Sequence, residues 1–241
     1  MLDTIRILGV TITNEEMDDI LEYFYSEIKK SKTKLFITTP NPEMLVYAHR
    51  HSVYKDKLNS SSIALPDGVG LFFASGLLGK ALKERIPGVD FIEKLCKESI
   101  DKPLSMGFLG AKPGIAEQAA KRLLKRYPYL DIRFVASEWD ESGFAWNKKK
   151  NDKHLDILFV AFGVPKQEEW IYANLPSLPV KAAMGVGGSL DFLSGNVRRA
   201  PFLIRLLGLE WLFRLITQPW RWKRQLALLT FIKLVLAKKD N

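Results

Sequence analysis

The sequence predicts an α/β fold, a Rossmann-like parallel sheet with helices on both faces, followed by a helical C-terminal appendage that associates with a membrane. Two observations predict this fold. Strand-like runs alternate with helical patterns over residues 1–195, and basic and apolar residues concentrate in residues 196–241. We therefore expect an α/β core of residues 1–195, which would hold the active site, and a basic amphipathic appendage of residues 196–241.

Seven strand-like runs recur along the chain. The runs cover residues 4–12, 34–39, 62–65, 104–109, 131–136, 156–161 and 180–186. Helical patterns lie between them, so the strands are expected to run parallel in one sheet. Helix starts support this interpretation. Thr13 and Glu16 have the spacing of a capping box, and Pro42 and Pro113 stand where a first-turn proline is tolerated.

Composition limits the cellular setting. Cys96 is the one cysteine, so an intramolecular disulfide is excluded and a reducing cytosol fits best. The N-terminus lacks a basic region followed by an apolar one, and we expect no signal peptide. The longest apolar stretch, at 226–237, is broken by Thr230 and Lys233 and is shorter than the ~18–20 residues that a spanning helix needs. We expect a cytoplasmic protein that lies on the inner face of the cell membrane.

The appendage carries most of the charge. Residues 197–241 hold ten Lys or Arg against two acidic residues, which is +8 of the formal +9 of the chain. Trp211, Trp220 and Trp222 lie there among Leu, Ile and Phe, a mixture suited to the interface of an anionic membrane. Nucleic acid is the alternative partner, but the apolar content exceeds what phosphate contact needs, and we expect no nucleic acid. Away from a membrane, this apolar face is expected to favour a homo-oligomer.

Five strand-like runs end in turn-forming or polar residues, at 39–43, 66–70, 110–114, 162–167 and 187–191. In a parallel sheet these ends share one edge, where helix N-termini offer N–H groups to anions. Ordinary connecting turns are the alternative, but five on one edge favour a phosphorylated or nucleotide ligand. There is no Walker A motif and no dinucleotide fingerprint, so ATP and NAD are weakly supported. The residues expected to bind this ligand are Gly110, Gly114, Gly163, Gly187 and Lys166.

Two carboxylates stand out among the residues at this edge. Asp67 lies between Pro66 and Gly68 after a buried run, a position that suits a general base. The alternative for Asp67 is an Asx-turn or a helix N-cap. Asp191 follows two glycines, and there a contact to a ribose hydroxyl competes with a helix cap.

No metal site is expected. His49 and His51 are two residues apart and do not share a helix face, and the pair Glu138 and Asp140 alone is weak support for a metal. A departing diphosphate would then be stabilised by arginines and helix dipoles. The candidate arginines, for which attraction to anionic lipid is the alternative in the appendage, are Arg85, Arg214, Arg221 and Arg224.

Six motifs, in order along nearly the whole chain, resemble the WecG/TagA/CpsF family of bacterial glycosyltransferases. They are TPNPE (39–43), PDG (66–68), FGVPKQE (162–168), VGG with DF (186–188 and 191–192), RAP (199–201) and LGLEW (207–211). The resemblance implies an inverting transferase without metal or cofactor. It would move an N-acetylmannosamine-type sugar from a UDP donor to an undecaprenyl-diphosphate-linked acceptor, with the appendage on the membrane.

The resemblance also implies roles for individual residues. Asp67 matches the base of the family, and Thr39 and Asn41 match residues that position the acceptor or the sugar. Gln167 and Asp191 fall in loops that would hold UDP. Arg85 and the three appendage arginines would neutralise a diphosphate.

Within the family we favour UDP-N-acetylmannosamine as donor and undecaprenyl-diphosphate-N-acetylglucosamine as acceptor, as in wall teichoic acid synthesis. The corresponding uronic acid donor remains an alternative, and the argument against it is that no extra cation for a sugar carboxylate is evident in the sequence. A protein that binds the UDP-sugar or the lipid diphosphate without catalysis is a second possibility. An RNA-binding protein that uses the basic tail is a third.

Overall fold

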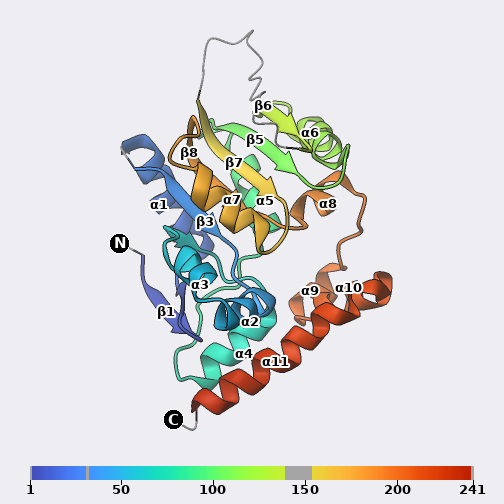
Figure 1. Cartoon of the computed structure of the whole chain (residues 1–241). Coiled ribbons are helices and arrows are strands. Elements are labelled where there is room, and N and C mark those ends of the chain that lie inside the picture. The colour runs from blue at the N-terminus through green and yellow to red at the C-terminus, as the bar shows by residue number, and fades with distance from the viewer. Residues whose placement is uncertain (1, 31–32, 139–153, 240–241) are drawn as a thin grey trace.

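The computed structural model describes residues 2–30, 33–138 and 154–239, and within these it leaves out the side chains of residues 221, 223–225 and 239. A six-stranded parallel sheet forms the centre of the molecule, with strand order β4-β3-β8-β7-β5-β6 (Figure 1). The predicted α/β fold is therefore confirmed. The strands are β3 (Leu35–Thr38), β4 (Ile63–Ala64), β5 (Ser105–Gly110), β6 (Asp131–Ala136), β7 (Leu155–Ala161) and β8 (Val180–Gly185).

Helices cover both faces of this sheet. Successive side chains of each strand point to opposite faces, so the central strands contribute to an apolar cluster on either side. In β7, Ile157 and Phe159 belong to one apolar cluster, and Leu158 and Val160 belong to another. The first cluster includes residues of α1 (Met17–Lys30), α5 (Gly88–Glu98), α6 (Ile115–Arg126) and α8 (Ser189–Ser194). The second is covered by α7 (Lys166–Asn174). Burial on both faces explains why β7 is apolar throughout its last five residues.

The prediction for residues 4–12 is wrong in one respect. They do not join the parallel sheet but form an antiparallel hairpin of β1 (Thr4–Ile7) and β2 (Val10–Thr13). The chain reverses at Leu8 and Gly9, whose φ angles are 50° and 83°, as a two-residue hairpin turn requires.

The capping box at the first helix is also wrong. Thr13 lies in β2, and its hydroxyl accepts the N–H of Ala64 (2.9 Å), so it joins the hairpin to β4. Helix α1 begins only at Met17, whose N–H donates to a carboxylate oxygen of Glu84 (2.7 Å). Pro42 does occupy a first-turn position, in α2, whereas Pro113 lies before α6, which begins at Ile115.

The appendage is helical, and its last helix packs against the body. It comprises α9 (Phe202–Leu206), α10 (Glu210–Thr217), the 3-10 helix η1 (Pro219–Arg221) and α11 (Trp222–Lys239). Phe231 and Val235 of α11 are each 1% exposed, inside a second core formed with the hairpin, α2 (Pro42–Arg50), α3 (Ser52–Asn59) and α4 (Val69–Leu77). The boundary at residues 195 and 196 stays a prediction, although α11 closes a core of the body.

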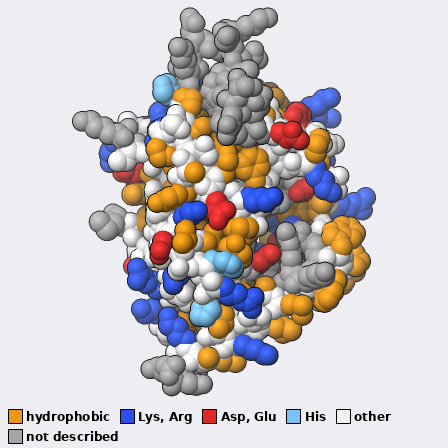
Figure 2. Space-filling model, in the orientation of Figure 1, with side chains coloured by type: hydrophobic (Ala, Val, Ile, Leu, Met, Phe, Trp, Pro, Cys, Tyr) orange, Lys and Arg blue, Asp and Glu red, His pale blue; other side chains and the backbone are white. Residues whose placement is uncertain are grey.

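A broad apolar surface remains exposed on the appendage. Figure 2 shows hydrophobic side chains gathered at the lower right, over α10 and α11 of Figure 1. Phe73 and Leu77 of α4, which packs beside α11, are exposed as well. Among the described helices, none is long and apolar enough to cross a membrane. The exposed apolar residues of the appendage include Phe202, Leu203, Leu206, Leu207, Ile216, Trp220, Trp222, Leu226 and Leu229.

Candidate active site

A cavity of about 800 Å³ lies at the carboxyl end of the parallel sheet. The loops after β3, β4, β5, β7 and β8 contribute to its wall, as the strand-end argument predicts, and helix α10 of the appendage adds Glu210 and Arg214. The site is therefore built from both parts of the chain. Sequence-predicted residues on its wall are Thr39, Asn41, Asp67, Gly163, Lys166, Gln167, Gly187, Asp191 and Arg214.

Asp67 lies where the loop after β4 meets the loop after β3. Its N–H donates to the carbonyl oxygen of Pro40 (2.9 Å), which joins the two loops. The N-cap of the following helix is Gly68, at φ 96°, so the carboxyl of Asp67 does not cap α4. The side chain is partly open to the cavity. The structure therefore does not support the cap alternative for Asp67.

The surroundings of Asp67 raise its pKa to about 6, against an ordinary value of 3.8. Burial is the main cause, and the negative charge of Glu210 adds to it. The guanidinium groups of Arg85 and Arg214 act in the opposite direction. A carboxyl group with a pKa of about 6 is largely ionised at neutral pH and is more basic than an ordinary aspartate, which suits a general base.

Thr39 and Asn41 line the cavity and also hold the backbone in place. The Thr39 hydroxyl donates to the carbonyl oxygen of Gly185 (3.1 Å) and joins the end of β3 to that of β8. The side-chain oxygen of Asn41 accepts the N–H of Met44 (3.0 Å) and caps α2. The cap fixes the position of the Asn41 side chain, whose NH₂ group is not used by this bond, and Asn41 lines both cavities together with Asp67.

The glycine residues divide into two groups. Gly163 (φ 78°) and Gly187 (φ 49°) line the cavity and need their left-handed conformations. Gly110 and Gly114 are not on the wall, so the structure does not bring them to the site. A Cβ at Gly110 would lie 2.8 Å from Phe162, which gives that glycine a packing role, and Gly114 caps α6 in a left-handed conformation.

Polar residues surround the rest of the cavity. Asp191 lies in the first turn of α8, whose N-cap is Gly188 without a side-chain cap, so the structure does not support the cap alternative for Asp191. Lys166 lies at the start of α7. Lys112, which the sequence analysis did not single out, also lines the wall, so the argument that the donor pocket has no further cation is weakened.

A smaller cavity of about 200 Å³ shares part of the same wall. The residues common to both are Asn41, Glu43, Asp67, Glu210 and Arg214. Arg85 lines the smaller cavity, with one guanidinium nitrogen 3.3 Å from the carbonyl oxygen of Arg205 and another 4.0 Å from Glu210. Val69, Trp211 and Leu228 give this cavity an apolar side between α4, α10 and α11. Asp67 thus stands where the two cavities meet.

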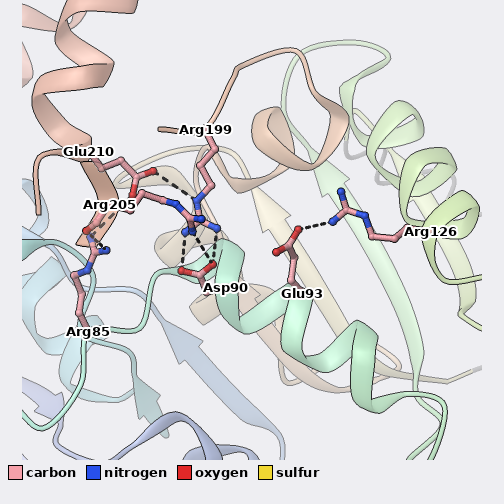
Figure 3. Close-up of polar contacts among 7 residues, drawn as sticks. All are labelled: Arg85, Asp90, Glu93, Arg126, Arg199, Arg205 and Glu210. Atoms are coloured by element: carbon pink, nitrogen blue, oxygen red, sulfur yellow. Dashed lines mark hydrogen bonds and ion pairs between the residues drawn. The ribbon is translucent and has the colours of Figure 1, made fainter. Parts of the chain in front are cut away.

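A network of charged residues holds α10 over the site (Figure 3). Arg199 donates two hydrogen bonds to Asp90 of α5, at 2.5 and 2.6 Å, and its Nε lies 3.8 Å from Glu210. Arg205 lies 4.0 Å from Asp90. In the same view, Glu93 pairs with Arg126 and joins α5 to α6. The paired, bidentate geometry around Asp90 fixes the start of the appendage on the body.

Sequence reasoning missed Glu210 on the wall of the site and Asp90 in the charged network beside it. The RAP and LGLEW motifs contain Arg199 and Glu210, but their partners lie far away along the chain. The T-shaped pair of Phe162 and Trp170, with ring centroids 5.5 Å apart, was also missed as a wall of the cavity. An aromatic pair of this kind offers an apolar surface beside polar groups.

The side chains of two of the predicted arginines, and one carboxylate of the pair considered as a metal site, fall outside the part that the structure describes. The side chains of Arg221 and Arg224 lie outside the described residues, as does Asp140 of the pair with Glu138. Among the residues that the structure describes, no group of three or more His, Cys, Asp or Glu could hold a metal ion. The predicted roles of Arg221 and Arg224 stay predictions.

The fold and the site define an α/β protein with a cavity at the carboxyl edge of a parallel sheet, bounded on one side by a C-terminal helix. This chain belongs to the glycosyl transferase WecG/TagA/CpsF family, whose profile matches residues 5–241. The resemblance found in the motifs is therefore confirmed.

Curated relatives cover almost the same length. A protein of Bacillus subtilis (strain 168), named N-acetylglucosaminyldiphosphoundecaprenol N-acetyl-beta-D-mannosaminyltransferase, is 32% identical over 240 residues, which cover 100% of this chain and 94% of the relative. A protein of the same name from Staphylococcus aureus (strain MRSA252) is 34% identical, covering 91% of this chain and 86% of the relative. These names support a glycosyltransferase role for the family.

Proposed function

We propose that this glycosyltransferase moves N-acetylmannosamine from UDP-N-acetylmannosamine to undecaprenyl-diphosphate-linked N-acetylglucosamine, in the synthesis of the wall teichoic acid linkage unit. The names of the relatives support this acceptor and this sugar. The observation that carries the chemistry is the position of Asp67, a carboxyl group of raised pKa at the junction of two cavities. The larger cavity would take the UDP-sugar, and the smaller one would take the diphosphate end of the acceptor.

In the proposed step, Asp67 removes the proton from a hydroxyl group of the acceptor sugar as its oxygen attacks the anomeric carbon of the donor. A new carbon–oxygen bond forms on one face while the bond to UDP breaks on the other, so the configuration inverts. Thr39 and Asn41 would keep the sugars in register with Asp67.

Charge that develops on the departing UDP needs cations or N–H donors. Lys112, Lys166 and Arg214 line the larger cavity, and Arg85 and Arg214 line the smaller one. These groups support a reaction in which side chains and backbone stabilise the diphosphates without a metal or a cofactor. Asp191 would bind the ribose of UDP, and the glycine loops at Gly163 and Gly187 would let the backbone approach the phosphates.

The exposed apolar surface supports an association with the membrane that carries the acceptor. Trp211, Leu212 and Ile216 of this surface lie on α10, the helix that also brings Glu210 and Arg214 to the site. An appendage adsorbed on the inner face of the cell membrane would thus bring the base to a lipid-linked sugar. A homo-oligomer that hides this surface when no membrane is present remains part of the proposal.

A transfer assay with several UDP-sugars and a short-chain polyprenyl-diphosphate-N-acetylglucosamine tests the proposal. We expect UDP-N-acetylmannosamine to be the best donor and the product to have the inverted, beta configuration. A clear preference for the uronic acid donor, which Lys112 could accommodate, would assign a different surface polysaccharide. Binding of UDP and acceptor without any transfer would favour the non-catalytic alternative.

A further inference from the structure

The side-chain oxygen of Gln167 accepts hydrogen bonds from the backbone of the protein itself. Gln167 is 1% exposed, at the start of α7, and its Oε1 accepts the N–H of Gly163 (3.2 Å) and the N–H of Gly187 (2.9 Å). These two glycines belong to the loops after the neighbouring strands β7 and β8. An amide oxygen has two acceptor positions, and both are used here. Gln167 therefore joins the two loops that form the wall of the larger cavity.

This arrangement requires one orientation of the amide group. With Oε1 toward the two backbone N–H groups, the Nε2 group must find an acceptor, and it lies 2.6 Å from Oε1 of Glu168. The reversed amide would place its NH₂ group against two N–H donors and its oxygen against a carboxyl oxygen. Because the site is buried, leaving these donors without acceptors is costly.

Glu168 in turn accepts a hydrogen bond from a residue of α3. Its side chain is fully buried, and its second oxygen accepts the hydroxyl of Tyr54 (3.1 Å), a residue of α3 that is 2% exposed. Tyr54 lies outside both cavities of the site. The chain of hydrogen bonds thus runs from α3 through Glu168 and Gln167 to the two glycine loops.

The backbone of β8 packs closely against the side chains of Gln167 and Glu168. A Cβ at Gly185 would lie 2.9 Å from Nε2 of Gln167 and 3.1 Å from Oε1 of Glu168. Any side chain at this position would push the amide away from its partners. The carbonyl oxygen of the same glycine accepts the Thr39 hydroxyl, so the strand that packs against Gln167 and Glu168 is also joined to the loop after β3.

We propose that Glu168 and Tyr54 are positioning residues of the donor site: they fix the orientation of the Gln167 amide, which in turn holds the loops at Gly163 and Gly187 where the diphosphate of the donor would bind. The identity of that donor rests on the proposed function. Gln167 then acts by shaping the loops and not by a hydrogen bond from its oxygen to the nucleotide.

The test compares variants of the buried pair with matched controls in the full-length protein. Glu168→Leu removes the acceptor for Gln167, and Glu168→Gln keeps an oxygen that can accept. Tyr54→Phe removes only the distant hydroxyl. Glu169→Leu is the control for Glu168, since Glu169 is a neighbouring, partly exposed carboxylate 3.8 Å from Lys57. Tyr25→Phe is the control for Tyr54, since its buried hydroxyl has no hydrogen-bond partner among the described residues.

The first readout needs no substrate. Hydrogen exchange of the Gly163 and Gly187 amides, followed by NMR, should be about tenfold faster or more in Glu168→Leu, which corresponds to a loss of ~1.4 kcal/mol of local stability. Glu168→Gln should recover most of the protection, and Tyr54→Phe should give a smaller increase than Glu168→Leu. Unchanged exchange in Glu168→Leu would overturn the proposal. If that variant does not fold, equal rates in Tyr54→Phe and Tyr25→Phe would overturn it.

The second readout is kinetic. Loosened loops should raise the KM for the UDP donor about tenfold in Glu168→Leu while kcat changes only a few-fold, because Asp67 and the acceptor residues are untouched. A tenfold fall in kcat with an unchanged KM for the UDP donor would contradict a role at the donor site. If the wild-type protein uses no UDP donor, the proposed function fails, whereas the exchange result still decides whether the hydrogen-bonded chain holds the loops.

Discussion

Replacing Asp67 by asparagine should stabilise the protein while it removes most of the activity. The pKa of Asp67 is raised from 3.8 to about 6. Between these pH values the folded protein binds a proton that the unfolded chain releases, so this contribution to stability is fully present below pH 3.8 and is lost as the pH rises through 6. Asparagine has nearly the same shape and stays neutral, so the variant keeps this contribution to stability at high pH.

The magnitude follows from the difference between the two pKa values. A difference of about 2 pH units corresponds to an upper limit of ~3 kcal/mol at pH 7.5. Because the carboxyl group keeps some contact with solvent in the cavity, we expect about 1–2 kcal/mol, or a Tm higher by ~2–8 °C in a protein of this size. Turnover should fall about 10²- to 10⁴-fold, which is the usual contribution of a general base, and UDP affinity should stay near the wild-type value.

Thermal unfolding of both proteins between pH 4 and pH 8, combined with the transfer assay at pH 7.5, tests this prediction. The Tm difference should be largest above pH 6 and should shrink toward pH 4, where both side chains are mostly neutral. A constant Tm difference at all pH values would refute the assigned ionisation of Asp67. Turnover within a few-fold of the wild type would remove Asp67 from the mechanism.

Three further predictions concern the surroundings of the base, the metal and the membrane. Glu210→Gln should lower the pKa of Asp67, because a nearby negative charge is removed, so the acid limb of the pH profile of kcat/KM should move to lower pH; an unmoved limb contradicts this. EDTA should leave transfer intact, whereas complete loss restored by Mg²⁺ or Mn²⁺ would point to Glu138 and Asp140. Full-length protein should bind anionic vesicles more tightly than neutral ones and dissociate partly at high salt, and equal binding to both would argue against electrostatic attraction to lipid.

The sheet could be predicted because its signals are local. Within the predicted run 156–161, residues 157–161 are apolar and β7 buries them on both faces, and a run of that length between helical patterns indicates a parallel strand. The hairpin was missed because its turn consists of Leu8 and Gly9, and leucine at a positive φ is not a usual turn signal. A single strand-like run, at 4–12, therefore concealed two short strands.

The candidate site could be predicted only in part. Asp67, Gly163 and Gly187 meet because the carboxyl ends of parallel strands share one edge. The loop after β5 does reach the cavity through Ala111 and Lys112, but Gly110 itself packs against Phe162 and is not on the wall, and no local sequence signal indicates that contact. The pairing of Arg199 with Asp90 spans 109 residues, so no sequence period indicates it.

The central claim is that the appendage completes the active site and does more than attach the protein to a membrane. Arg214 tests it most directly, because this residue of α10 lines both cavities and lies 4.7 Å above the ring of Phe192. Lys238, an exposed residue of α11, is the control for loss of a positive charge in the appendage.

The measurement is the rate of sugar transfer to a water-soluble acceptor analogue by full-length Arg214→Gln and Lys238→Gln, without vesicles. We predict that Arg214→Gln loses at least tenfold in kcat/KM, since a cation beside the diphosphates is removed, and that Lys238→Gln stays near the wild-type rate. Equal rates for the two variants would contradict the claim and would leave the appendage as an anchor alone.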